Sequence, residues 1–218
     1  MRAVVIALGC IATVLTLPCW ANGQNSIGDL LTSEKLLWST VYRAGGSSLF
    51  CAKPFSEKGG LFSVSQIYSG KQLKRSLRCI TDRQCSIMNP RYPYITADLH
   101  NLYPALTRVE EARGNAQFKE LGASVPSAFE DIGCDLKTAF KAIEPRDGAK
   151  GNIARALFYM HIEYDLPLPG PAAMYKKWHQ LDPADAEEQA RNDSIEKLQG
   201  TRNRFIDDPG LVDTLIAD

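Results

Sequence analysis

Apolar side chains recur at helical spacing in several parts of the chain. The pattern is strongest at residues 151–165, where one side of a helix would be buried, and it returns at residues 26–44 and 171–181. Residues 184–198 are predicted to form a polar helix that carries several charged pairs. Gly200 stands where a glycine commonly ends a helix. The tail from residue 203 shows no such pattern, so we expect it to be irregular.

Shorter apolar stretches flanked by turn-forming residues predict strands. Residues 48–52 and 61–68 have this character, and we expect them to pair as a hairpin across the breaker-rich stretch between them. Residues 129–143 are mixed, and we expect a strand beside Cys134. Turns or irregular loops are predicted at residues 89–93, 113–115 and 145–148. With 218 residues, 44% of them hydrophobic, and no repeat or linker, the pattern predicts one mixed α+β domain.

The first 21 residues have the three-part layout of a secretory signal peptide. Met1-Arg2 gives a positive start, residues 3–17 are apolar and uncharged, and we expect cleavage after Ala21. The apolar run is shorter than the roughly 20 residues that a bilayer requires, which favours cleavage over an uncleaved anchor. A lipoprotein site at Cys19 is disfavoured because Pro18 stands where a small residue is expected. We therefore expect a secreted or periplasmic protein with no remaining membrane segment.

The expected mature domain, residues 22–218, contains Cys51, Cys79, Cys85 and Cys134. Four cysteines in an oxidising compartment imply two disulfides, which can be connected in three ways. Cys79 and Cys85 are close enough in sequence to close a small loop, which leaves a long-range Cys51–Cys134 bond. Free thiols or a zinc site are the alternatives, but no C-x-x-C pair is present to favour zinc.

Charge is balanced over the whole chain, with 25 basic and 25 acidic residues, so no overall field attracts nucleic acid. The stretch from residue 71 to residue 83 is locally basic and is the best candidate for a surface that contacts phosphates. A solvated face beside a disulfide loop explains the same pattern equally well. The basic residues are Lys71, Lys74, Arg75, Arg78 and Arg83, and Asp82 is the one acid among them.

Familiar catalytic motifs are absent: the chain has no G-x-S-x-G, no P-loop, no H-E-x-x-H and no dinucleotide-binding glycine pattern. The three histidines are His100, His161 and His179. We expect His161 and His179 to be structural or exposed. His100, close to Asp98, is more often a hydrogen-bonded structural residue in such a setting than a catalytic one.

Several phrases, in a consistent order, resemble the bacterial endonuclease I family. Residues 97–105 (Ala-Asp-Leu-His-Asn-Leu-Tyr-Pro-Ala) resemble its central motif, and Arg113-Gly114-Asn115 follows at the family's distance. Residues 151–160 resemble its long helix, residues 49–51 an early strand, and scattered positions from Trp178 to Phe205 its C-terminal pattern. No single match is specific, whereas the ordered set is.

The resemblance implies a helix-rich, disulfide-stapled single domain with a ββα-metal (His-Me finger) site. The family is described as secreted or periplasmic nucleases that cut DNA and RNA with little sequence preference and usually use Mg²⁺. Nucleic acid is then the implied partner, and we expect a monomer.

Carried onto this sequence, the family's site is incomplete. Ser65 stands at the position of a glutamate metal ligand and Gln66 at that of the general-base histidine. Asn115 matches a second metal ligand, and Arg83 lies close to the position of a transition-state arginine. Serine lacks the anionic oxygen that a hard cation prefers, and a carboxamide cannot accept a proton near neutral pH.

We therefore expect a family member that keeps the fold but cuts nucleic acid poorly or not at all. Its affinity for nucleic acid would come from the basic residues Lys71, Lys74, Arg75 and Arg78. One alternative is an active nuclease with a relocated base, such as His100. The other is an exported interaction domain that no longer uses nucleic acid.

Overall fold

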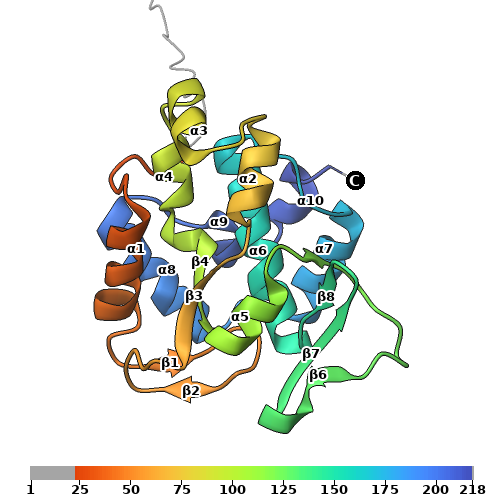
Figure 1. Cartoon of the computed structure of the whole chain (residues 1–218). Helices are drawn as coiled ribbons and strands as arrows, with labels where there is room; N and C mark the ends of the chain where they lie inside the picture. The colour runs from red at the N-terminus through yellow and green to blue at the C-terminus, as the bar shows by residue number, and fades with distance from the viewer. Residues whose placement is uncertain (1–22, 218) are drawn as a thin grey trace, which may run out of the picture.

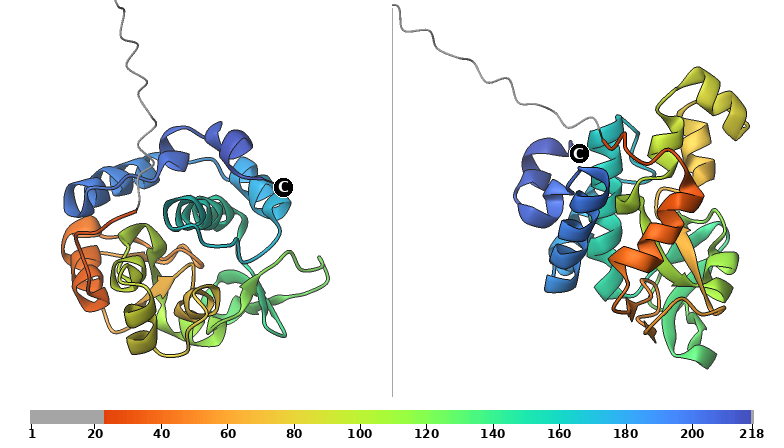
Figure 2. Two further views of the ribbon diagram at one scale, coloured as in Figure 1. Left: turned by 90° about the horizontal axis from the view of Figure 1, so that it is seen from above. Right: turned by 90° about the vertical axis from the view of Figure 1, so that its left-hand side faces the viewer.

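The computed structural model describes residues 23–217, and the predicted signal peptide at residues 1–21 lies outside them. Helix α6 (Asp147–Tyr164) runs through the middle of the molecule, with other elements on all sides (Figures 1 and 2). It is buried around most of its circumference, as expected for a helix at the centre of a core. The helix predicted at residues 151–165 is therefore confirmed, but it begins earlier. The predicted turn at residues 145–148 is wrong in its second half, because α6 already begins at Asp147. Gly148 lies in the first turn of this helix with non-helical backbone angles.

The N-terminal helical pattern is also confirmed, with shorter bounds. Helix α1 (Leu30–Leu36) continues into the π-helical turn η1 (Leu37–Val41). It begins at Asp29 because this side chain accepts a hydrogen bond from the backbone N–H of Thr32 and so caps the first turn.

The predicted hairpin between residues 48–52 and 61–68 is wrong. Strand β3 (Phe62–Gln66) pairs antiparallel with β4 (Leu102–Leu106), about forty residues further along the chain. The short strand β1 (Gly46–Ser47) pairs instead with β2 (Pro54–Phe55). The stretch after β1 turns back and reaches β4, since the backbone N–H of Leu49 donates to the carbonyl of Pro104 at 2.9 Å.

A third sheet, of four strands, packs on the other side of α5 (Thr107–Arg113), in the spatial order β5-β8-β7-β6. The strand expected beside Cys134 is confirmed as β7, which begins at that residue. The bounds are β5 (Gln117–Phe118), β6 (Ser127–Phe129), β7 (Cys134–Ala139) and β8 (Ala142–Glu144), with the 3₁₀ turn η3 (Glu130–Ile132) between β6 and β7.

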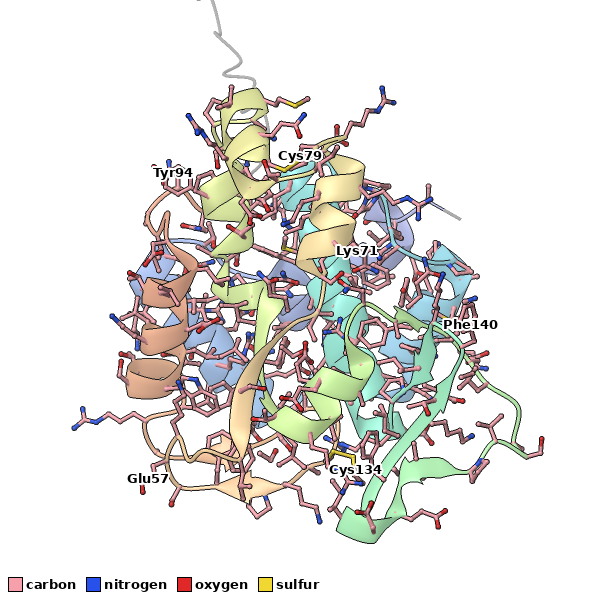
Figure 3. The ribbon with its side chains drawn as sticks, in the orientation of Figure 1. Glu57, Lys71, Cys79, Tyr94, Cys134 and Phe140 are labelled. Carbon is pink, nitrogen blue, oxygen red and sulfur yellow. A yellow bond between two sulfur atoms is a disulfide. The ribbon has the colours of Figure 1, made fainter. Side chains whose placement is uncertain are left out.

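Both predicted disulfides are confirmed: Cys51 is bonded to Cys134 and Cys79 to Cys85. They lie at opposite ends of the molecule, as the labelled Cys79 and Cys134 show in Figure 3. The first joins the segment after β1 to the start of β7, and the second closes the connection between α2 (Gly70–Ser76) and α3 (Asp82–Met88).

The C-terminal helices α7 (Ala172–Leu181) and α8 (Ala186–Gln199) are confirmed, and α8 ends at Gly200, whose φ of +77° is in the left-handed region. The prediction of an irregular tail from residue 203 is wrong, because two helices, α9 (Arg204–Asp207) and α10 (Leu211–Leu215), follow α8. These helices are too short to show a helical period, yet they bury Phe205 and Val212 in the main core.

Three short elements link the second half of the basic stretch to β4: α3, α4 (Tyr92–Thr96) and the 3₁₀ turn η2 (Leu99–Asn101). The loop predicted at residues 89–93 is therefore wrong in part, because α4 begins at Tyr92 with Pro93 in its first turn, where the missing N–H of proline costs no helical hydrogen bond. None of the helices within residues 23–217 is long and apolar enough to span a bilayer.

Candidate functional site

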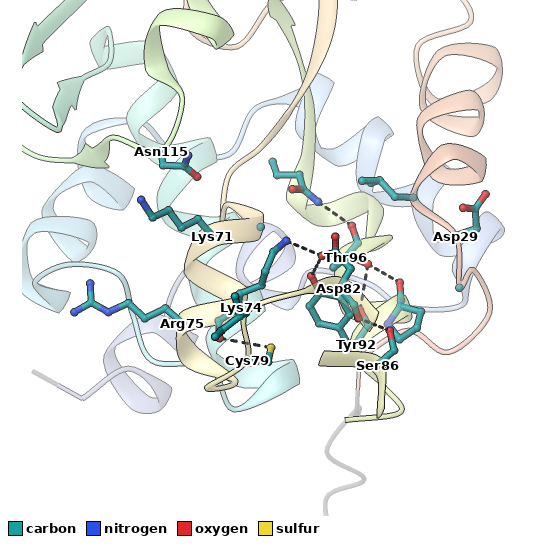
Figure 4. A pocket seen from close by; sticks show the side chains of 16 residues that line it. Asp29, Lys71, Lys74, Arg75, Cys79, Asp82, Ser86, Tyr92, Thr96 and Asn115 are labelled. Carbon is teal, nitrogen blue, oxygen red and sulfur yellow. Dashed lines mark hydrogen bonds and ion pairs between the residues drawn. The ribbon is translucent and has the colours of Figure 1, made fainter. Parts of the chain in front are cut away.

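A cavity of about 1040 Å³ lies where the end of β3, the start of α2 and the loop after α5 meet. Its walls include predicted site residues that are far apart in sequence (Figure 4). An open cavity with a few convergent polar groups is the usual form of a ligand site. The predicted residues that line it are Gln66, Lys71, Lys74, Arg75 and Asn115.

Strand β3, strand β4 and helix α5 form a ββα unit, and its two ends supply the polar groups of the cavity. Gln66 is the last residue of β3, and its Nε2 donates to the carbonyl of Thr96 at 3.1 Å. Asn115 is exposed just beyond α5. Gly114, between the end of α5 and Asn115, has a φ of +50° and turns the chain there. A residue with a side chain would adopt this φ only with backbone strain. Gln66 and Asn115 thus line the same cavity.

Ser65 does not line the cavity. Its side chain is fully buried, and its Oγ accepts a hydrogen bond from Nη1 of Arg113 at 2.9 Å. The same guanidinium donates through Nη2 to the carbonyl of Ile67 at 3.1 Å and is partly neutralised by Glu110, three residues earlier on α5. Burial lowers the pKa of Arg113, and the Glu110 carboxylate opposes that shift. The hydroxyl is therefore held by a fixed positive charge.

The residues of this ββα unit do not fit a magnesium ion. Mg²⁺ prefers carboxylate oxygens and a near-octahedral shell, whereas the unit lines the cavity with the carboxamides of Gln66 and Asn115. Ser65 is buried, and the Glu110 carboxylate of α5 is paired with Arg113. The Arg113 guanidinium beside the hydroxyl would also repel a second cation. Within residues 23–217, no group of three or more His, Cys, Asp and Glu side chains could hold a metal.

The basic residues divide into two groups. Lys71 and Arg75 are exposed on the cavity wall, and Figure 4 shows Lys71 beside Asn115 with Arg75 extending outward. Lys74 also lines the cavity but is paired with Asp82, its Nζ lying 2.8 Å from Oδ1. Hydrogen bonds from Lys74 and from Tyr92 lower the pKa of Asp82.

Arg78 and Arg83 are exposed but lie outside the cavity, at the connection between α2 and α3 and within α3. The structure therefore brings three of the four predicted phosphate-contacting residues together at the cavity, and it places Arg83 away from Gln66 and Asn115.

The histidines are all held by backbone carbonyls. His100 is fully buried, its Nε2 lies 3.0 Å from the carbonyl of Thr201, and its Nδ1 has no hydrogen-bond partner among residues 23–217. Burial lowers the pKa of His100 to about 4, and the Asp98 carboxylate opposes the shift. His161 lies 2.6 Å from the carbonyl of Leu166, and the buried His179 lies 3.3 Å from that of Pro209. None of the three lines the cavity.

Burial of a neutral His100 predicts a loss of stability in acid. The unfolded chain protonates a histidine near pH 6.5, whereas the folded protein keeps His100 neutral down to about pH 4, so the unfolded state binds more protons between these values. The stability present above pH 6.5 is therefore lost as the pH falls, by about 3 kcal/mol when the loss is complete. Urea unfolding of the wild type and of His100→Gln at several pH values measures it.

Glutamine keeps a donor for the Thr201 carbonyl but does not titrate, and the comparison cancels the contributions of all other groups. We expect the wild type to lose about 2–3 kcal/mol more than the variant between pH 7 and pH 4.5. Parallel curves would show that His100 is protonated equally easily in both states.

Sequence reasoning missed the contact between Arg113 and Ser65. It treated Arg113 only as part of a motif with Asn115. The available signal was Glu110, which stands three residues before Arg113 and so lies on the same face of the helix. A carboxylate at this spacing indicates that the arginine has a partner and can be buried.

The chain matches the family model described as Endonuclease I over residues 69–210, a region that begins after Ser65 and Gln66. It is 34% identical over 137 residues to an extracellular ribonuclease of Bacillus amyloliquefaciens, covering 54% of this chain and 46% of the relative. It is 36% identical over 159 residues to an extracellular deoxyribonuclease of Aeromonas hydrophila, covering 70% and 67%. A periplasmic deoxyribonuclease of the same organism is 36% identical over 114 residues, covering 50% and 47%. The match thus spans about half the length of the ribonuclease.

Proposed function

This chain belongs to the endonuclease I family, and we propose that it is an exported nucleic-acid-binding protein with weak or no nuclease activity. Members of the family are generally metal-dependent. The observation that carries this proposal is the pair at the end of β3. The Ser65 hydroxyl is buried under Arg113, and Gln66 presents a carboxamide to the cavity. Neither group offers an anion for a cation or a base for water.

Binding is supported by the exposed cations of the cavity wall. Phosphate contacts supply most of the affinity of non-specific nucleic-acid binding. Lys71 and Arg75 on this wall form no ion pair within residues 23–217, whereas Lys74 is neutralised by Asp82. Arginine suits this role because its planar guanidinium binds phosphate oxygens in a bidentate way. Gln66 and Asn115 add amide donors and acceptors at the end of the same cavity. Export is supported by relatives that are named extracellular or periplasmic.

A relocated base finds little support in the cavity. His100 is buried away from it with a lowered pKa. The cavity carboxylates Asp29 and Asp82 are both held by hydrogen bonds, to Thr32 and to Lys74 and Tyr92, which lower their pKa and weaken them as bases.

Two assays on the purified protein without residues 1–21 test the proposal. We expect short DNA and RNA duplexes to shift in a gel at low salt and to be released as salt rises. Supercoiled plasmid should stay intact in Mg²⁺ as it does in EDTA. Strong nicking that EDTA abolishes would favour a relocated base, and absence of binding even at low salt would favour an interaction domain.

Reversing two charges on the cavity wall should weaken this binding. We expect Lys71→Glu with Arg75→Glu to lower the affinity for duplex about tenfold or more, and to reduce the slope of log K against log salt by about two. Fluorescence anisotropy at several salt concentrations measures both. The matched control is Arg43→Glu with Lys197→Glu, which makes the same charge change at exposed positions outside the cavity. Equal losses in the two double variants would mean that only net charge matters.

A further inference from the structure

Helix α3 carries an exposed apolar tip. Ile87 and Met88, in its last turn, are 73% and 56% exposed, and Ile80, just before its N-cap, is 81% exposed. Figures 1 and 2 show α3 projecting from the body of the molecule beyond α2 and α4. Single exposed apolar residues are normal, but three within nine residues, in and just before one projecting helix, indicate a contact surface. We call Ile80, Ile87 and Met88 the α3 tip.

The support of the α3 tip is stiff. The Cys79–Cys85 disulfide ties the start of α3 to the segment before it. Asp82 joins α3 to its neighbours, since it accepts hydrogen bonds from Lys74 of α2 and from the hydroxyl of Tyr92 in α4. A rigid support lowers the entropy lost when the exposed side chains are buried in a complex.

The surroundings of the α3 tip are positively charged. Lys71, Arg75, Arg78 and Arg83 are exposed in the same stretch, and its one acid, Asp82, is paired with Lys74. Ile80 itself lines the cavity that carries Lys71 and Arg75. Ile80, just before α3, therefore borders the cationic cavity wall, and the positive charge around the α3 tip complements a polyanion.

We propose that the α3 tip is a wedge that inserts at a base step of a nucleic-acid duplex held by the cavity wall. The proposal rests on the proposed function. Proteins that bend DNA use aliphatic side chains of this kind to unstack a base step, while nearby cations hold the phosphates on either side. Ile87 and Met88 would enter the stack, and the cations Arg75, Arg78 and Arg83 would contact the flanking backbone.

The test compares Ile87→Ser/Met88→Ser with Leu61→Ser/Leu181→Ser, which removes exposed apolar side chains elsewhere, 75% and 57% exposed. A short DNA duplex carries 2-aminopurine at its centre, whose fluorescence rises on unstacking, and a dye pair at its ends that reports bending. We expect the wild type and the control to raise both signals. The wedge variant should lose both signals and about fivefold or more in affinity. Its salt slope should be unchanged, because no phosphate contact is removed.

Three results would overturn the wedge. If the wild type binds the duplex without unstacking or bending it, the wedge proposal is wrong while the proposed function stands. If the wild type does not bind duplex at all, the proposed function itself is wrong. If the wedge variant binds duplex with unchanged signals but loses binding to phosphatidylglycerol vesicles, the α3 tip serves a membrane surface instead.

Discussion

A variant that lacks the Cys51–Cys134 disulfide should be about 4–5 kcal/mol less stable to unfolding, because the bond closes a loop with a sequence separation of 83 residues. Opening this loop returns a large conformational entropy to the unfolded chain. Alanine is a suitable replacement, since both cysteines are buried and alanine adds no polar atom there. Urea unfolding of Cys51→Ala/Cys134→Ala under oxidising conditions measures the loss.

The second disulfide provides the matched control. Cys79 and Cys85 are six residues apart, so Cys79→Ala/Cys85→Ala should cost only about 2–2.5 kcal/mol by the same reasoning. Both variants remove one bond between two buried cysteines. Their difference therefore isolates the effect of loop length, and equal costs would contradict the entropic explanation.

The sequence predicts the elements of this fold better than their partners. A helical period marks α6 and α7 because each has enough turns to repeat its apolar face, whereas charged pairs and the glycine at its end mark the polar helix α8. An alternating pattern marks β3 but cannot reveal that β4 is its neighbour, because the pairing depends on the whole chain between them. Helices α9 and α10 escape detection because each is little more than one turn long.

The candidate site was predicted in part by resemblance, and the family itself is confirmed by the matched model. Gln66 and Asn115 line one cavity, and their assigned roles in it stay predictions. Burial of Ser65 against Arg113 depends on how α5 packs on β3, which no local pattern encodes. Arg83 lies outside the cavity although Asp82 and Ser86 of the same helix line it, and the sequence pattern does not show which face of so short a helix is turned to the cavity.

If Ser65 and Gln66 are the positions that limit cleavage, restoring both should create a nuclease. In Ser65→Glu, one oxygen of the new carboxylate would accept from the Arg113 guanidinium, which already donates to the side chain at this position. The added negative charge would offset the repulsion between Arg113 and a cation, and the second oxygen of the longer side chain would be left for the cation. In Gln66→His, one ring N–H would have the carbonyl of Thr96 as its acceptor, as Gln66 has now. That bond would fix the tautomer and leave the other ring nitrogen towards the cavity and Asn115.

We expect the double variant to nick supercoiled plasmid in Mg²⁺ about a hundredfold faster than the wild type or more, since a general base alone is typically worth ~10²–10⁴ in rate. The rate should fall to the wild-type value in EDTA. The single variants are the controls, and each should gain much less, because a base without a ligand and a ligand without a base act poorly alone. A double variant that stays folded in a thermal melt but nicks no faster than the wild type would contradict the assignment of Ser65 and Gln66.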